Sequence, residues 1–226
     1  MPDLAVFQQS PLFAHLSPGQ LSRLATLAQP RRYRKDQVVF NEGDPGTALY
    51  VIVKGRVKIA RSSLDGKERT LVLLGPGDFF GELGVIDGGP RSADAVAVED
   101  ADALVLPREE FRAFLLEQPQ VAMELLVVLS RRIRRTSQIV HDAAFFDVRG
   151  RLARVLLELA KAEGKPDAGG ALVCPHLTQG ELAGMVGVTR ESINKWLRTL
   201  ERHGTVAQRR GRLVLLEPER LRDEIA

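Results

Sequence analysis

The sequence predicts an α+β protein with an N-terminal all-β part, then a long helix and a C-terminal helix-turn-helix. Three observations support this prediction. Short apolar runs alternate with glycine turns over residues 12–116, no glycine or proline interrupts residues 120–140, and a compact helix-capping pattern begins at Thr178. Each pattern is typical of one structural class, and their order along the chain gives the architecture.

Composition restricts the class of protein further. The chain has 226 residues, with an apolar share of 44% and a charged share of 27%, which are ordinary values for a globular protein of two modest domains. The single cysteine, Cys174, can form no internal disulfide and is too little for an iron–sulfur cluster or a cysteine-based zinc site. Because we find neither a signal peptide nor a membrane-length apolar run, we expect a cytoplasmic protein with no membrane partner.

The basic residues are unevenly distributed. Residues 1–144 contain 18 basic and 18 acidic side chains, whereas residues 186–212 contain seven basic and two acidic ones. A compact basic segment indicates a polyanion partner, although a solvated charged face would have the same composition. Charge alone therefore does not distinguish the two.

Glycine turns divide the N-terminal part into short strands. They include Gly43, Gly46, Gly55 and the stretches 75–77 and 87–90. This rhythm is typical of an all-β sandwich or roll. The dipeptide at positions 65–66 is Asp-Gly, which lies between an alternating run and an apolar run and predicts a β-hairpin.

The glycine-free stretch after Pro119 predicts a long helix. Apolar or small residues recur at steps of three and four, which predicts a seam where two copies of the helix pair in a homodimer. The alternative is packing on the β part of the same chain, although more than five turns exceed what a small roll covers. The seam residues are Ala122, Leu125, Leu129, Ile133, Thr136 and Val140.

Capping signals divide the C-terminal part into helices. Asp147 is the expected N-cap of a helix that ends before a polar loop at residues 164–170, and Thr178 with Glu181 forms a capping box. Gly187 allows a sharp turn, and Thr189 caps the next helix. The apolar positions fit a helix-turn-helix, and they are Leu182, Val186, Val188, Ile193, Trp196, Leu197 and Leu200.

The exposed face of the second helix carries side chains that can read bases. Arginine and lysine can bind guanine, and glutamate can accept from the cytosine amino group. A solvated face with an Arg-Glu pair is the alternative. Residues 205–208 and 213–216 predict a hairpin wing whose arginines bind phosphates. These DNA-binding candidates are Arg190, Glu191, Asn194, Lys195, Arg209, Arg210 and Arg212, to which we add Thr178, Gln179 and Thr189 at the helix starts.

Five segments together resemble the cyclic AMP receptor protein family, the CRP/FNR-type transcription regulators. They are NEGDPGTALYVIVKGRVKI, FFGELGVIDGGPRSA, RRTS, FDVRGRLA and LTQGELAGMVGVTRESINKWL. The resemblance covers nearly the whole chain. It implies a double-stranded β-helix (jelly roll) that binds a cyclic nucleotide in residues 1–117, a dimerisation helix and hinge in 118–144, and a winged helix-turn-helix in 145–226.

The resemblance also implies a binding site for 3′,5′-cyclic AMP as an allosteric effector. Arg91 and Ser92 would bind the phosphate, Glu82 would accept from the ribose hydroxyl, and the backbone at Gly81 and Leu83 would approach the ligand closely. Arg132, Thr136 and Ser137 would close the pocket, and the two hydroxyls would accept from the adenine amino group. The expected partners are a second copy, RNA polymerase and double-stranded DNA with TGTGA-like half-sites, at which the protein would act as an activator.

Two other functions remain open at this stage. One is a regulator of the same fold that binds DNA without nucleotide or responds to a different effector. The other is a metal-dependent enzyme on a β-roll, which requires clustered histidines. We expect no enzyme and no metal because the four histidines are scattered and no His-X-His occurs; they are His15, His141, His176 and His203.

Overall fold

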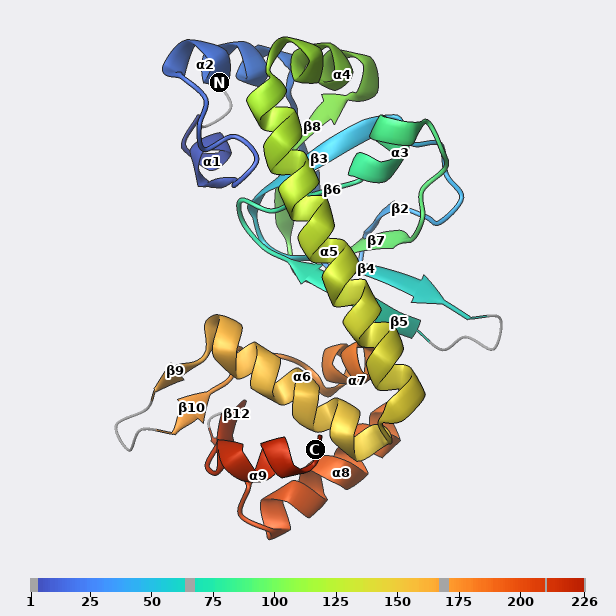
Figure 1. Ribbon diagram of the computed structural model, residues 1–226, viewed down its shortest axis with the longest axis vertical. Helices are drawn as coiled ribbons and strands as arrows, with labels where there is room; N and C mark the ends of the chain where they lie inside the picture. The colour runs from blue at the N-terminus through green and yellow to red at the C-terminus, as the bar shows by residue number, and fades with distance from the viewer. Residues whose placement is uncertain (1–3, 64–67, 167–170, 210, 226) are drawn as a thin grey trace. The chain divides into compact units, whose positions relative to one another are not determined.

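The computed structural model describes residues 4–63, 68–166, 171–209 and 211–225 (Figure 1). The chain divides into two compact units. The first comprises residues 1–61 and 71–134, and the second comprises residues 62–70 and 135–226. The division at residue 134 falls inside the long helix, so the expected boundaries at 117 and 144 stay a prediction.

Strands β1 to β8 form two four-stranded sheets within the described residues, with the orders β1-β8-β3-β6 and β2-β7-β4-β5. Apolar side chains from both sheets meet in one cluster that includes Ile52, Val57 and Phe80, so part of the core lies between the sheets. The strands are β1 Gln29–Tyr33, β2 Val38–Phe40, β3 Ala48–Lys54, β4 Val57–Ser62, β5 Glu68–Leu74, β6 Phe79–Phe80, β7 Asp94–Ala97 and β8 Ala101–Pro107. The expected turn at Asp65-Gly66 lies outside the described residues, but β4 and β5 are neighbours in their sheet, as a hairpin requires.

Helices interrupt the stretch that the glycine rhythm marked as all-β. Ser17 accepts from the backbone of Gln20 and forms a capping box with it, so a helix begins at Pro18. Phe13 and Phe111 meet edge to face at 6.4 Å in a second apolar cluster, on which the first part of the long helix also packs. The helices of the first unit are α1 Leu4–Gln9, α2 Pro18–Leu27, α3 Glu82–Asp87 and α4 Arg108–Glu117.

The long helix α5 spans Pro119–Phe145, and its 27 residues present two apolar faces. One face packs into the core of the first unit through Val121 and Leu125, with Leu129 partly buried beside them. The predicted seam therefore had the wrong phase in its first half, because Leu125 and Leu129 pack within their own chain. The exposed apolar stripe consists of Met123, Leu126, Ile133 and Val140.

Among the residues that the structure describes, no single helix is long and apolar enough to cross a membrane. Only α4 and α5 taken together reach that length and composition, and the pair is bent by 111°.

The second unit has the predicted helix-turn-helix at its centre. Asp147 caps α6 by accepting from the backbone of Gly150, the Thr178–Glu181 capping box opens α7, and Thr189 caps α8. Gly187, with φ +74°, ends α7 in the left-handed region. The helices of the second unit are α6 Val148–Glu163, α7 Gln179–Val186, α8 Arg190–Arg202 and α9 Pro218–Asp223.

A small sheet completes the second unit, and its described strands have the order β11-β12-β10-β9. The wing hairpin was predicted, but the loop at residues 164–170 begins with a short strand that was not. The strands are β9 Lys165–Pro166, β10 Leu172–Val173, β11 Val206–Arg209 and β12 Arg212–Leu215. Leu152, Leu156, Val186 and Ile193 are fully buried in the core of this unit.

Candidate functional sites

Arg91 lies in the loop before β7 and is a buried cation. Only 4% of its surface is exposed, and its terminal nitrogens donate to the carbonyl oxygens of Gly81 and Ala48 at 2.7 and 2.9 Å. Its Nε has no hydrogen-bond partner among the described residues, and burial lowers the pKa of its guanidinium. Glu82 and Asp44 favour the charged form electrostatically, but no described carboxylate forms an ion pair with Arg91, so the site suits an anion.

Glu82 is the first residue of α3, and its carboxylate is also buried. Its Oε1 accepts from Nη1 of Arg132 on α5 at 2.7 Å, and Arg132 also donates to the carbonyl of Phe79. The Arg132 guanidinium lies 4.8 Å from the centre of the Phe79 ring. Glu82 and Arg132, the arginine predicted to close the pocket, are therefore already joined.

Gly81 directly precedes the acid Glu82 and contacts the buried Arg91. Its φ is +81°, and a Cβ at this position would lie 2.6 Å from Nη1 of Arg91, so any larger residue would both strain the backbone and displace the guanidinium. Leu83 and Ser92 are exposed beside this bend. The structure thus brings together Gly81, Glu82, Arg91 and Arg132, with Leu83 and Ser92 accessible at the edge.

Thr136 and Ser137 are exposed on α5 and belong to the second unit. They follow Arg132 by about one turn of the same helix. Their contact with a ligand base stays a prediction.

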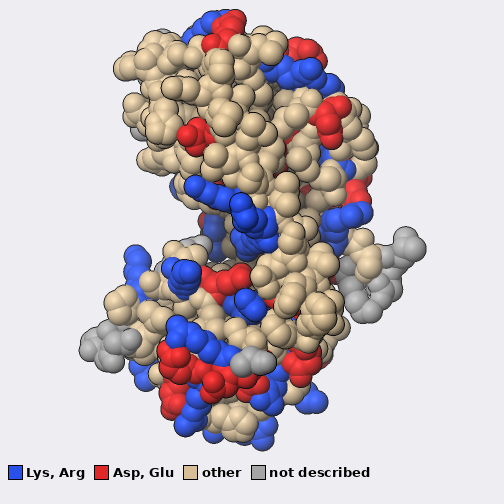
Figure 2. Space-filling model, in the orientation of Figure 1, with Lys and Arg blue, Asp and Glu red and all other residues tan. Residues whose placement is uncertain are grey.

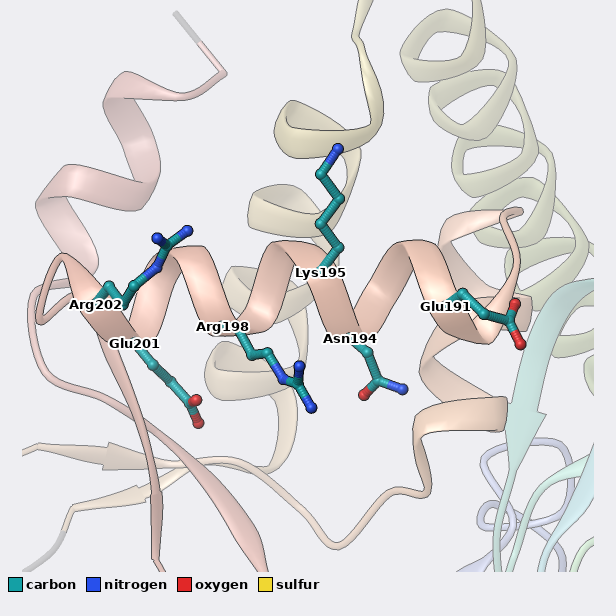
Figure 3. Close-up of a pocket in the computed structure, with 6 residues that line it drawn as sticks. All are labelled: Glu191, Asn194, Lys195, Arg198, Glu201 and Arg202. Atoms are coloured by element: carbon teal, nitrogen blue, oxygen red, sulfur yellow. The ribbon is translucent and has the colours of Figure 1, made fainter.

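The exposed side of α8 has an open hollow (Figure 3). In this view Asn194 and Arg198 extend to one side of the helix and Lys195 to the other. Three apolar side chains of the same helix, Ile193, Leu197 and Leu200, are buried. Sequence analysis missed Arg198 and Arg202, although their spacing of three and seven residues from Lys195 places them on the same exposed face of α8. Six residues line the hollow: Glu191, Asn194, Lys195, Arg198, Glu201 and Arg202.

The first turn of α8 is ordered by local hydrogen bonds. Glu191 has a lowered pKa because its own backbone N–H and the Thr189 side chain stabilise the carboxylate. Nε of Arg190 donates to the side-chain oxygen of Gln179 at 3.5 Å, which joins the start of α8 to the start of α7. Thr178 and Thr189 act as caps, so their expected contacts with DNA would be additional roles.

The wing carries two of the three expected phosphate-binding arginines on described strands. Arg209 ends β11 and Arg212 begins β12, and both are exposed, whereas Arg210 lies outside the described residues. On the face that Figure 2 shows, acidic and basic side chains are interspersed over the second unit. The candidate surface is therefore marked by the helix and wing that carry it rather than by charge alone.

The comparisons with known proteins match both units. Residues 30–118 match the model of the cyclic nucleotide-binding domain, and residues 150–224 match the Crp-like helix-turn-helix domain. The chain is 36% identical over 216 residues to the CRP-like cAMP-activated global transcriptional regulator of Mycobacterium tuberculosis, covering 96% of each protein. It is 38% identical over 197 residues to the cyclic AMP receptor protein of Thermus thermophilus, covering 87% of this chain and 88% of that protein.

Among solved structures, the chain is similar to CLP of Xanthomonas campestris, which is described as a c-di-GMP-responsive global regulator. The TM-score is 0.78 at 27% identity, covering 88% of this chain and 99% of the other. A cyclic nucleotide-binding domain followed by a DNA-binding helix-turn-helix defines a class of transcription regulators rather than of enzymes. The chain belongs to the CRP/FNR family of these regulators.

Proposed function

We propose that this protein is a cyclic-AMP-responsive transcription regulator. The observation that supports cyclic nucleotide binding most strongly is the buried Arg91, which has no carboxylate ion pair among the described residues and lies beside the buried acid Glu82. A cyclic phosphate would supply the missing anion, and a ribose 2′-hydroxyl could donate to the acid. The relative from M. tuberculosis is named as cAMP-activated, which supports the choice of effector.

We further propose how binding would control DNA affinity. A nucleotide held by Glu82 and Arg91, with its base at Thr136 and Ser137, would favour one arrangement of α5, and the hinge at residues 145–147 would pass this change to α8. A coupling of about 1 to 3 kcal/mol would change DNA affinity roughly 5- to 150-fold.

The working form that we propose is a homodimer in the cytoplasm. Its exposed stripe on α5 would pair with the same stripe of a second copy, and two copies of α8 would enter successive major grooves about 34 Å apart. The target would be a pseudo-palindrome with TGTGA-like half-sites, read by Arg190, Glu191 and Lys195, and activation would involve RNA polymerase.

Calorimetric titration tests the effector. Cyclic AMP should bind the wild type and not the Arg91→Leu variant, and that variant should keep its fold because Leu fills much of the same space. Cyclic GMP and cyclic di-GMP are the comparison ligands, since the X. campestris relative is described as responsive to the latter. Binding of cyclic AMP that survives Arg91→Leu would contradict the proposed phosphate contact.

DNA binding with and without cyclic AMP tests the switch. We expect ligand to raise the affinity for a TGTGA-containing pseudo-palindrome at a fixed salt concentration. Equal affinity in its absence would instead support the second candidate, a regulator of the same fold that does not need a nucleotide.

A further inference from the structure

Two aromatic rings, Phe40 and Tyr50, lie against the buried guanidinium of Arg91, and a third ring, Phe80, packs on both of them. The central carbon of the guanidinium lies 4.2 Å from the centre of the Phe40 ring and 5.5 Å from that of Tyr50. Tyr50 stacks on Phe80 at 4.9 Å with an interplanar angle of 11°, and Phe40 contacts both rings at 5.6 and 5.8 Å. We call Phe40, Tyr50 and Phe80 the aromatic seat.

The aromatic seat is assembled from both sheets of the first unit. Phe40 ends β2 in one sheet, whereas Tyr50 and Phe80 are paired residues of β3 and β6 in the other. Phe80 is fully buried, and Phe40 and Tyr50 are half-buried above it. The rings therefore form a packed surface from residues of both sheets, and the arginine lies against two of them.

The aromatic seat addresses an electrostatic problem. A buried cation is costly unless it is compensated, and the usual compensation is a carboxylate. No described residue forms an ion pair with Arg91, although the nearby Glu82 and Asp44 carboxylates and the Tyr50 side chain favour its charged form. Its direct contacts are two carbonyl oxygens and the Phe40 and Tyr50 rings. A carboxylate would compete with an incoming phosphate, whereas ring faces stabilise the cation and leave its positive charge available.

We propose that Phe40 and Tyr50 are positioning residues that hold Arg91 charged and oriented toward one phosphate oxygen of the ligand. This inference rests on the proposed binding of a cyclic nucleotide. It differs from ordinary core packing, in which the rings would contribute equally whatever residue stood at position 91.

The first experiment needs no ligand. Phe40→Leu and Arg91→Met are combined in a double-mutant cycle of urea unfolding on the full chain. If the ring stabilises the cation, Phe40→Leu should change the unfolding equilibrium constant about fivefold to thirtyfold more in the Arg91 background than in the Met background. Val39→Ala is the matched control, because Val39 borders the same cluster on β2 and forms no cation contact with Arg91. Equal effects of Phe40→Leu in both backgrounds would overturn the proposal.

The second experiment measures orientation. In the two phosphorothioate diastereomers of cyclic AMP, sulfur replaces one or the other exocyclic phosphate oxygen, so the ratio of their dissociation constants reports which oxygen Arg91 binds. Phe40→Leu and Tyr50→Leu should reduce that ratio about fivefold or more, and Tyr50→Phe should preserve it because the ring remains. A variant that weakens the binding of both diastereomers equally would show that the rings only pack in the core, and would contradict their proposed role in positioning Arg91.

The two experiments separate the inference from the proposed function. If the wild type binds no cyclic nucleotide, the proposed effector is wrong, and the ligand-free cycle still decides whether the rings stabilise the cation. If the wild type binds cyclic AMP but the cycle shows no coupling, the proposed function stands and the aromatic seat has no such role.

Discussion

Arg132 on α5 donates to the carboxylate of Glu82 on α3 at 2.7 Å, although 50 residues separate them in the sequence. The Glu82 side chain is 6% exposed and that of Arg132 is 28% exposed. The acid that we assign to the ribose is thus joined to the long helix before any ligand arrives. A ribose hydroxyl would have to share this carboxylate with Arg132, so a ligand bound at Glu82 would act directly on α5.

Arg132→Met should destabilise the first unit. The substitution leaves the buried Glu82 carboxylate without its ion pair, which should lower the free energy of unfolding by about 1 to 3 kcal/mol, less than for a fully buried pair because Arg132 is partly exposed. Urea unfolding measures this change. Arg134→Met, on an exposed side of the same helix, is the control and should change stability by less than about 0.5 kcal/mol. Equal effects of the two substitutions would show that the pair is unimportant.

Glu82→Gln should weaken the binding of cyclic AMP about tenfold or more. The amide keeps the shape of the side chain but loses the charge that strengthens a hydrogen bond from the ribose. Calorimetry with 2′-deoxy cyclic AMP is the control, because that ligand lacks the hydroxyl and should bind wild type and variant alike. A similar loss for both ligands would place the effect elsewhere in the pocket.

Ile133→Glu should disrupt the proposed homodimer. Ile133 is 67% exposed in the single chain and lies in the middle of the apolar stripe, where a paired helix would bury the new charge. Analytical ultracentrifugation should then show a monomer. Arg131→Glu places the same carboxylate about 200° away around the helix and should remain dimeric. A dimeric Ile133→Glu variant would contradict pairing through the exposed stripe of α5.

Local capping chemistry made the helix-turn-helix predictable. Asp147, Thr178 and Thr189 accept the expected backbone hydrogen bonds, and Gly187 takes the left-handed conformation that a residue with Cβ adopts only with strain. Such signals act within one turn of chain, so one sequence contains all the information that they need.

The faces of α5 were only partly predictable. A heptad count records apolar spacing but not what each face contacts, and α5 has one apolar face toward its own core and another toward solvent. The count joined Leu125 from the first face with Ile133 from the second. Tertiary packing, which the local pattern does not contain, separates them.

The aromatic seat was not predicted for a similar reason. Phe40, Tyr50 and Phe80 occur in three separate strands and have the spacing of ordinary core residues. Only the pairing of β3 with β6 and the approach of β2 bring the rings to Arg91. The resemblance to a family pointed to Glu82 and Arg91 themselves, but not to what holds the arginine in place.

Glu191→Ala and Arg198→Ala should affect DNA binding in different ways. Loss of Glu191 should relax the preference at one base position by about 1 to 3 kcal/mol, because its ionised carboxylate can accept from a cytosine amino group. Loss of Arg198 should weaken binding to all DNA sequences alike, and it should reduce the slope of log affinity against log salt concentration by about one. Binding to a set of single-base variants at several salt concentrations measures both, and interchanged results would reverse the two assignments.

Cys174 should make the stability of the second unit depend on pH above about 9. Its thiol is 2% exposed, and burial raises its pKa from 9.0 to about 11. The folded chain therefore keeps this proton where the unfolded chain has released it, so the free energy of unfolding should fall between pH 9 and 11 and be unaffected below that range, with an upper bound of about 2 to 3 kcal/mol. Subtracting the unfolding free energies of Cys174→Ala from those of the wild type removes the contribution of lysines and tyrosines that titrate in the same range. A difference that stays constant from pH 8 to pH 10.5 would show that the buried thiol ionises as easily in the folded chain as in the unfolded one.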